Sequence, residues 1–312
     1  MAPSVAAVEI VEVTGGEPFA RWHAAMKAAS ERTDAPEGYV DWRRQATDTV
    51  WLLATDGGDD VAAGLALTGW YSPPHVARAD VRVAPAHRGR GFGLEVYRAL
   101  STWAAERGVT ELHGETWEDD PASLVWAKRQ GYLEIGRNSR LSLDLTAIEA
   151  PAADPPPGIE IITWAERPDA AAGMYAVVLE ALPDIPGEED ADPGTLEEWL
   201  SRDMQGAGDK PEATFVAFAD DKVVGYAKLS LSLARKEVAM HDLTGVLRAW
   251  RGKGIAAALK RTQIAWAKSA GYAKLETSNE VRNEPIRRLN ERHGYVVEPG
   301  EITLAGPLAP QP

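Results

Sequence analysis

The sequence predicts an α+β protein made of two copies of one domain, each a mixed, mainly antiparallel sheet flanked by helices. The main observation is an internal repeat: residues 81–93 (VRVAPAHRGRGFG) resemble residues 244–256 (TGVLRAWRGKGIA). Arg88 and Arg251 are 163 positions apart (251 minus 88), and five further identical pairs keep that offset without a gap. Self-similarity at a fixed offset indicates a duplicated domain.

The second observation is the order of apolar patterns, which is the same in both copies. Each copy is expected to begin with a strand and two helices, continue with a hairpin and a strand that enters the Arg-Gly motif, and then form a helix, a strand and a last helix. The expected ranges are 8–13, 22–30, 49–55, 61–70, 93–108 and 111–116 in copy one, and 159–164, 169–182, 213–219, 222–232, 256–271 and 274–278 in copy two.

The repeat also predicts the domain boundaries. Copy one is assigned to residues 1–149 and copy two to residues 159–312, with the proline-rich stretch 150–158 (APAADPPPG) as the linker between them. Copy two is longer in its acidic stretch 184–199 (DIPGEEDADPGTLEEW), which is typical of a loop that carries specificity.

Composition excludes several classes of function. The chain has 312 residues, a formal net charge of −14 and no cysteine, and its six histidines show no metal-binding spacing. The negative charge argues against nucleic-acid binding, and no apolar run is long enough to span a membrane. We therefore expect a cytoplasmic protein with no metal, no membrane partner and no nucleic-acid partner.

The Arg-Gly motif is suited to binding an anion. A strand that turns directly into a helix exposes unpaired backbone N–H groups and the positive end of the helix dipole, and glycine allows a ligand to approach that backbone closely. The spacing matches neither a Walker loop nor a Rossmann fingerprint.

These residues resemble the acetyl-coenzyme A loop of the GCN5-related N-acetyltransferase (GNAT) family. In both copies a valine precedes the loop, a helix follows it, and a Gly-Tyr pair ends 44 residues after the arginine (132 minus 88; 295 minus 251). The resemblance implies that acetyl-coenzyme A is the co-substrate, and that two strands splay apart around its pantetheine arm. The implied cofactor-binding residues are Val83, Arg88, Gly89, Arg90, Gly91, Phe92 and Gly93 in copy one, and Thr244, Val246, Arg251, Gly252, Lys253, Gly254, Ile255, Ala256 and Asn283 in copy two.

The copies depart from the family at the general acid. Many members carry a tyrosine four residues before the final Gly-aromatic pair, where this sequence has Ala127 and Asn290. Asn290 could still hydrogen-bond the thioester or the sulfur, whereas Ala127 could not. Asn283 is matched by Asp120 in copy one; its amide could hold a pantetheine amide, or it could simply cap a helix.

Copy two also offers candidates for the base and the acceptor site. His241 and Asp242 are neighbours on one strand, so at most one points into the cleft; the alternative is a structural pair. Glu276 is another candidate with an equally good structural explanation. Asp184 begins the acidic stretch next to the expected acceptor site, where it could bind a cationic substrate or only fix a turn.

We therefore predict that copy two transfers acetyl directly to a small-molecule primary amine in a ternary complex. Two alternatives remain: a non-catalytic coenzyme A-binding sensor, and an acetyltransferase for protein lysines or N-termini. The tandem is expected to act either as a monomeric pseudo-dimer or as a homodimer.

Overall fold

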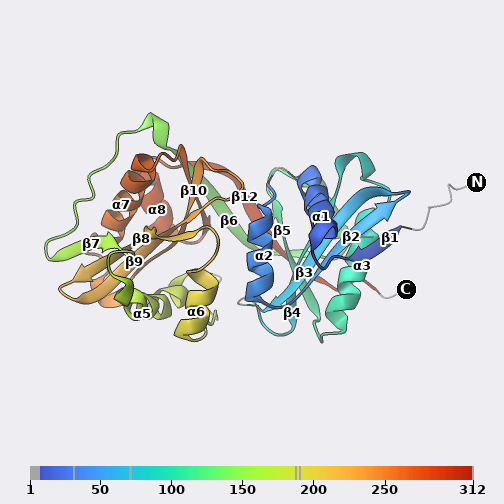
Figure 1. Ribbon diagram of the computed structural model, residues 1–312, viewed down its shortest axis with the longest axis horizontal. Helices are drawn as coiled ribbons and strands as arrows, with labels where there is room; N and C mark the ends of the chain where they lie inside the picture. Colours follow the sequence, from blue (N-terminus) through green and yellow to red (C-terminus); the bar gives the residue numbers. More distant parts are fainter. Residues whose placement is uncertain (1–7, 31, 70–71, 187, 190, 311–312) are drawn as a thin grey trace, which may run out of the picture. The chain divides into compact units, whose positions relative to one another are not determined.

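The computed structural model describes residues 8–30, 32–69, 72–186, 188–189 and 191–310 (Figure 1). The chain forms two compact units, each described here by itself. Unit 1 comprises Met1–Ile135 and Ile302–Pro312, and unit 2 comprises Gly136–Glu301. Among the described residues, every helix is too short or too polar to cross a membrane.

Unit 1 is a sheet in the order β1-β2-β3-β4-β5-β12. The pairs β1–β2, β2–β3 and β3–β4 are antiparallel, and β4 pairs with β5 in parallel. Its elements are β1 (Glu9–Glu12), α1 (Gly16–Ala29), α2 (Pro36–Gln45), β2 (Ala46–Asp56), β3 (Asp59–Gly69), β4 (Val76–Val83), α3 (Phe92–Ala105), β5 (Glu111–Trp117) and α4 (Pro121–Arg129), together with the start of β6 and the end of β12.

Unit 2 repeats this plan in the order β6-β11-β10-β9-β8-β7, and its one parallel pair among those described is β10 with β11. Its elements are β6 (Leu133–Asp144, from Gly136), β7 (Ile159–Thr163), α5 (Ala171–Ala181), α6 (Leu196–Asp203), β8 (Asp209–Ala219), β9 (Lys222–Leu231), β10 (Val238–Val246), α7 (Ile255–Ser269), β11 (Lys274–Glu280), α8 (Glu284–Arg292) and β12 (Val296–Pro307, to Glu301). The predicted mixed, mainly antiparallel α+β fold is confirmed.

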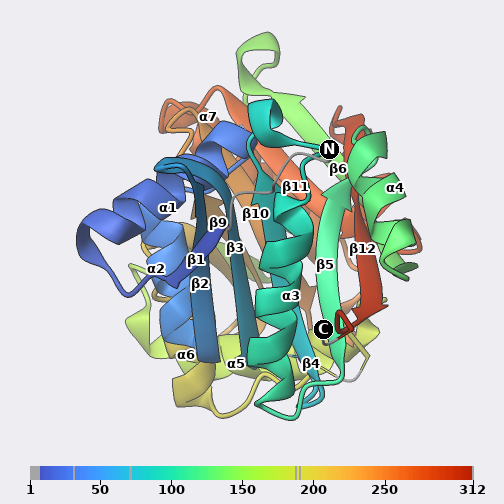
Figure 2. The ribbon, with the colours of Figure 1, turned by 90° about the vertical axis from the view of Figure 1, so that its right-hand side faces the viewer.

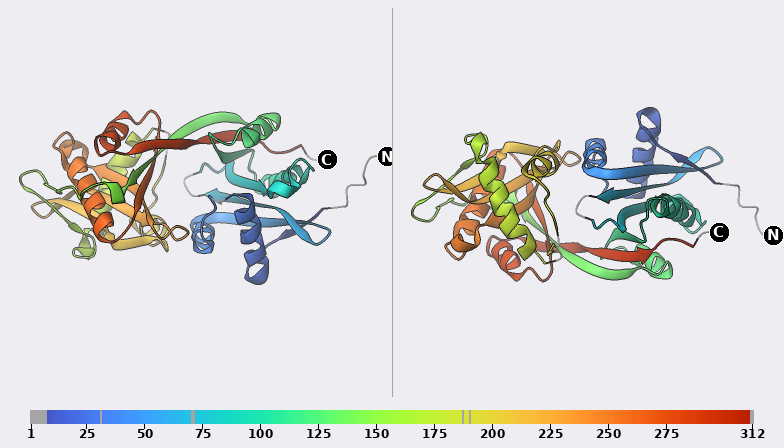
Figure 3. Two further views of the ribbon diagram at one scale, coloured as in Figure 1. Left: turned by 90° about the horizontal axis from the view of Figure 1, so that it is seen from above. Right: turned by 90° about the horizontal axis from the view of Figure 1, so that it is seen from below.

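The compact units differ from the repeats along the chain, because β6 and β12 each contribute residues to both units (Figure 3). In unit 2, β6 pairs antiparallel with β11, with Ser142 opposite Glu276. In unit 1, Ile302 and Leu304 of β12 pack on Ala127 of α4. The last strand of each repeat thus completes the sheet of the other unit. Sequence comparison cannot show such an exchange, since both copies carry an equivalent strand.

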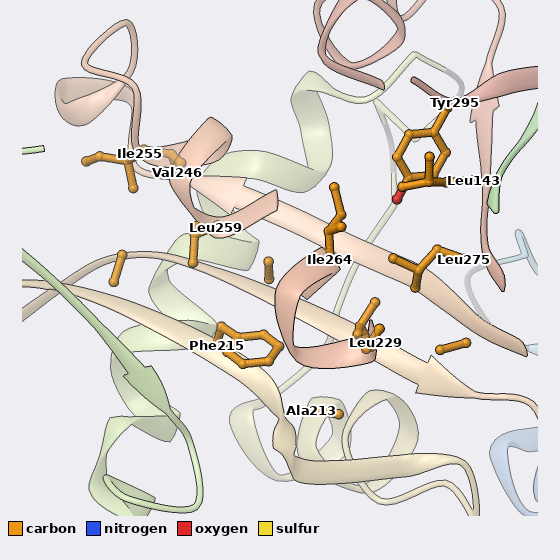
Figure 4. Packing of buried hydrophobic residues seen from close by; sticks show 14 of the residues in the cluster. Leu143, Ala213, Phe215, Leu229, Val246, Ile255, Leu259, Ile264, Leu275 and Tyr295 are labelled. Atoms are coloured by element: carbon orange, nitrogen blue, oxygen red, sulfur yellow. The ribbon is translucent and has the colours of Figure 1, made fainter. Parts of the chain in front are cut away.

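Each sheet is covered by helices on both faces. In unit 2, α7 packs on one face over a core that includes Phe215, Leu259 and Leu275 (Figure 4), and α5 and α6 cover the other through a second cluster around Trp199. In unit 1, α3 lies along the sheet (Figure 2), while α1 and α2 bury Trp22 on the opposite face. Two-sided cover explains why the central strands are almost continuously apolar.

Candidate active site

The predicted glycine-containing turn from a strand into a helix is present in both units. In unit 2, Gly252 (φ +74°) and Gly254 (φ +86°) are left-handed, and Gly254 is the N-cap of α7 without a side-chain cap. Gly89 (φ +76°) and Gly91 (φ +93°) repeat this before α3. A Cβ atom added at Gly252 or Gly89 would meet nothing within 4 Å. Both helix N-termini therefore have backbone donors free of side-chain caps and open space beside them.

The arginine that begins each motif, Arg88 or Arg251, stabilises the loop through hydrogen bonds within the chain. Arg251 donates from Nε to the Val246 carbonyl (2.9 Å) and from Nη1 to Asp184 Oδ2 (2.6 Å). Arg88 similarly donates to the carbonyls of Val83 (3.1 Å) and Ala29 (3.2 Å). These arginines therefore stabilise the conformation of the loop by hydrogen bonds to other groups of the protein. We expect them to affect ligand binding indirectly, through that conformation.

Asp184 lies against the cofactor loop. Its carboxylate accepts hydrogen bonds from Arg248 (2.8 and 3.1 Å) and from Arg251 (2.6 Å), and these bonds lower its pKa to about 2. Asp184 is therefore engaged in holding the loop to the end of α5, rather than standing free for an amine. Two residues of the acidic stretch, Gly187 and Asp190, lie outside the described residues.

The other motif residues are placed as the pattern predicts for a strand–helix junction. Ile255 and Phe92 are buried as the first residues of α7 and α3. Lys253 Nζ lies 4.3 Å from the Trp250 ring centroid, whereas Arg90 forms an ion pair with Asp56 at 2.7 Å. A Cβ at Gly93 would lie 3.2 Å from Val83, while Ala256 occupies the matching position in unit 2.

The strands beyond the loop splay apart, as the family resemblance implies. β10 pairs with β11 only from Val238 to Met240, and β4 pairs with β5 only from Val76 to Arg78. The remaining residues of β10 and β4 run on without this neighbour toward the two loops. This opens each sheet at the position where an extended ligand arm would have to enter.

A β-bulge distinguishes unit 2 from unit 1 at this point. His241 opposes Leu229 and Thr244 opposes Ala227, so that Asp242 and Leu243 together oppose the single residue Lys228 of β9. In unit 1 the corresponding residues of β4, 78–83, pair one to one with β3. A bulge disrupts the ladder locally and redirects side chains and backbone groups, and such bulges are frequent next to active sites.

The bulge is anchored by a buried lysine. Lys228 Nζ contacts Asp242 Oδ2 (2.7 Å) and Asp209 Oδ1 (2.9 Å), and it donates to the carbonyl of Asp203. Burial alone would lower the pKa of Lys228, but the carboxylates of Asp242 and Asp209 raise it above its ordinary value. The other oxygen of Asp242 accepts from the Leu243 N–H at 2.7 Å. Asp242 thus holds the bulge while its side chain stays 45% exposed.

His241 points to the opposite face of β10, as strand alternation requires. It is buried beneath α7, where Nδ1 contacts Gln263 Oε1 (3.0 Å) and Nε2 contacts the Tyr295 hydroxyl. Burial, together with the nearby Lys260, lowers its pKa well below 6.5. With both ring nitrogens engaged in the core, His241 is placed as a structural clamp of the bulge rather than as a base exposed to an acceptor.

Lys260 is a second buried lysine, 1% exposed, on the inner face of α7. Its Nζ lies 5.4 Å from the Tyr295 ring centroid, and burial lowers its pKa from 10.5 to about 7. Unfolding therefore takes up a proton between about pH 7 and pH 10.5, so this group makes stability rise with pH across that window.

Replacing Lys260 by methionine is expected to reduce the increase of the free energy of unfolding with pH. One titrating group contributes a slope of at most about 1.4 kcal/mol per pH unit. Urea unfolding at about pH 7 and about pH 10 measures the difference. Lys253→Met, at an exposed lysine of the same loop–helix segment, is the control and should keep the wild-type pH dependence. Equal slopes for wild type and Lys260→Met would contradict the account of this side chain.

Asn290 and Asn283 provide polar groups beside β11. Asn290 is fully buried; its Nδ2 donates to Asn279 Oδ1 (2.8 Å), and its Oδ1 has no hydrogen-bond partner among the described residues. Asn283 is the N-cap of α8 but makes no side-chain capping bond. A buried acceptor without a donor is costly, so Asn290 is suited to a ligand N–H or S–H group.

Unit 1 satisfies the equivalent positions internally. Asp120 caps α4 by accepting from the Ser123 N–H (3.1 Å) and hydroxyl (2.7 Å), and Ala127 stands in place of Asn290. On β4, Arg82 bonds Asp80 (2.8 Å) and Thr33 Oγ1 (2.6 Å). The polar side chains of Asp120 and Arg82 are therefore hydrogen-bonded within the chain.

Sequence reasoning missed Lys228, Arg248 and the bulge itself. Lys228 carried a usable signal, because a lysine within the apolar strand KVVGYAKLSLS requires an acidic partner once that strand is buried. The bulge had no such signal, since one extra residue in a strand pairing leaves no characteristic residue type. In the described part of the chain, no three His, Asp or Glu side chains gather as metal ligands.

Comparison with known proteins identifies a family and several relatives of this chain. The family model described as acetyltransferase (GNAT) family matches residues 17–132 and again 172–295. A mycothiol acetyltransferase of Brachybacterium faecium is 28% identical over 71% of this chain and 66% of its own length. A mycothiol acetyltransferase of Streptomyces coelicolor is 23% identical over 89% of this chain and 88% of its own. The chain thus spans about two thirds of the first relative and most of the second.

A solved tandem GNAT protein from the clavulanic acid biosynthesis pathway shares the fold, with a TM-score of 0.79, 19% identity and coverage of 98% of this chain and 100% of that one. The two family matches lie within the two sequence copies, and each contains one Arg-Gly loop. The chain therefore belongs to the acetyltransferase (GNAT) family, with two GNAT domains in tandem.

Proposed function

We propose that unit 2 transfers an acetyl group from acetyl-coenzyme A directly to the primary amine of a small molecule, and that unit 1 is not catalytic. The observation that carries this proposal is the bulge of β10. Both units have an open glycine loop, but only unit 2 has the bulge at this position of the strand. The available amides of Asn283 and Asn290 add to the same difference between the units.

The residues of unit 2 fit acetyl-coenzyme A. The first-turn N–H groups of α7, beside Gly252 and Gly254, would hold the pyrophosphate, and the unpartnered Oδ1 of Asn290 would accept from a pantetheine amide or from the sulfur as a thiol. Asn283 can both donate to and accept from an amide. Acetyl-coenzyme A, when bound, supplies an acetyl group activated as a thioester.

The chain's own contribution is to orient the acceptor and manage its proton. A backbone N–H between Thr244 and Val246 is the proposed donor to the carbonyl oxygen. The carboxylate of Asp242, exposed on the side opposite His241, is the proposed partner of the incoming ammonium and takes its proton through water. We assign no proton transfer to His241.

A small-molecule acceptor is supported by the names of the two relatives, which specify mycothiol. An exposed carboxylate at the bulge also suits a compact cationic amine. Because the chain has no cysteine, we place this reaction in the cytoplasm.

Asp242→Asn is expected to lower kcat/KM for the amine by at least about tenfold, because the amide cannot accept a proton or pair with an ammonium ion. Initial rates of coenzyme A release, measured across a panel of small primary amines, provide the measurement. Asp209→Asn removes the other carboxylate on Lys228 and is the control for the anchor. An unchanged kcat/KM in Asp242→Asn would remove Asp242 from the mechanism.

The same assay separates the alternatives. Turnover with peptides but with no small amine would replace the small-molecule proposal by a protein acetyltransferase. Binding of coenzyme A without turnover of any amine or peptide would leave a non-catalytic coenzyme A-binding protein.

A further inference from the structure

The segment between the two copies is fixed along helix α7. Arg261 in α7 donates from Nε to the carbonyls of Ala152 (3.0 Å) and Ala153 (3.1 Å), and from Nη2 to the carbonyl of Asp154 (3.0 Å). Three prolines follow, at 155–157. Residues 150–158, here called the strap, are thus held by one guanidinium rather than acting only as a flexible connection.

The strap reaches the cofactor loop. A Cβ atom added at Gly254 would lie 3.7 Å from Cγ of Pro156. Gly254 is the N-cap of α7, and its left-handed conformation (φ +86°) directs the chain from the loop into the helix. The Ile159 N–H donates to the Pro156 carbonyl at 3.0 Å, which closes a turn before β7. A rigid proline therefore lies beside the glycine that sets the direction of the helix donors.

Among the described residues of unit 1, the matching arginine and glycine have different neighbours. Arg98, which matches Arg261 at the same offset, forms an ion pair with Glu95 one turn away at 2.7 Å. At Gly91, which matches Gly254, an added Cβ would meet nothing within 4 Å. In the described part of the chain, the contact between a proline and the N-cap glycine of the cofactor loop is thus found in the unit to which the proposed function assigns catalysis.

We propose that the strap positions the cofactor loop of unit 2, and that Arg261 is the positioning residue that holds it there. This inference rests on the proposed function of unit 2. Two glycines make the loop 252–254 intrinsically mobile, and a mobile loop must be ordered when a ligand binds. The strap, held by three hydrogen bonds from Arg261, keeps Pro156 beside the loop and orders the loop before a ligand binds. The free-energy cost of ordering the loop on binding is then smaller, and binding is stronger.

Arg261→Met is expected to raise the Kd for coenzyme A about 5- to 10-fold, measured by calorimetric titration of the intact chain. Amide hydrogen exchange at residues 252–257 of the ligand-free protein should become faster, while exchange in β9 stays the same. Arg98→Met is the matched control and should change neither quantity. Arg261→Lys should restore binding only in part, because an ammonium lacks the planar fork of donors.

Each outcome bears on a different part of the account. A wild-type chain that does not bind coenzyme A would overturn the proposed function itself. Binding by wild type and Arg261→Met with the same Kd would overturn the strap proposal alone. A higher Kd with unchanged exchange at 252–257 would also overturn positioning, since Arg261 would then act by another route. If Arg261→Met does not fold, Pro156→Gly tests the same contact with all three hydrogen bonds retained, and an unchanged Kd there contradicts the proposal.

Discussion

Replacing Glu276 by alanine is expected to lower the free energy of unfolding by about 3–5 kcal/mol, the cost of removing one partner from a buried ion cluster. Glu276 is 1% exposed on β11. Its carboxylate contacts Arg140 of β6 (2.5 Å) and binds Arg235 through both guanidinium nitrogens (2.7 Å each). Lys274 Nζ lies 3.3 Å from the same carboxylate, so alanine would leave three cations facing a vacated buried position. Urea unfolding at neutral pH measures the loss.

The same residue predicts an acid-sensitive part of the stability. Burial would raise the pKa of Glu276, but hydrogen bonds from Arg235 and Arg140 lower it from 4.5 to about 2. A lowered pKa in the folded state means that the contribution is complete above about pH 4.5 and is lost as the pH falls toward 2. Glu276→Gln, which keeps the shape without the charge, should lose this dependence. A catalytic role for Glu276 would instead give loss of turnover in Glu276→Gln with unchanged stability.

Much of the fold was predictable because it follows from patterns that repeat. The duplication and the strand–loop–helix junctions recur at matching positions, so each copy supports the interpretation of the other. The exchange of β6 and β12 was not predictable, since pairing between distant strands depends on which sheet has a free edge. The order of the sheet strands therefore required the structure.

The candidate site was predicted in its residue types but less well in its contacts. The glycines of both loops lie as expected, because left-handed turns require them. Arg251 and Asp184 were predicted as binding residues, yet they form a hydrogen bond with each other. A loop with two glycines has few conformational restraints of its own, so neighbouring side chains have to stabilise it. His241 and Asp242 do face opposite ways, but only the contacts with Gln263 and Lys228 show which one is buried.

Replacing Gly252 by alanine is expected to lower kcat/KM for acetyl-coenzyme A by at least about tenfold, although the substitution adds only one methyl group. The added Cβ meets no protein atom within 4 Å, so it projects into the space proposed for the pyrophosphate. A positive φ at a non-glycine residue also costs about 1–2 kcal/mol, which favours another loop conformation. Gly89→Ala makes the same change at the same φ in unit 1 and is the matched control.

The rate of coenzyme A release by the wild type, Gly252→Ala and Gly89→Ala, with one amine substrate and with unfolding temperatures checked in parallel, tests most directly whether unit 2 is the working half. The account predicts a loss of at least about tenfold for Gly252→Ala and a rate near that of the wild type for Gly89→Ala. Equal losses, or a loss only in Gly89→Ala, would contradict the assignment of catalysis to unit 2.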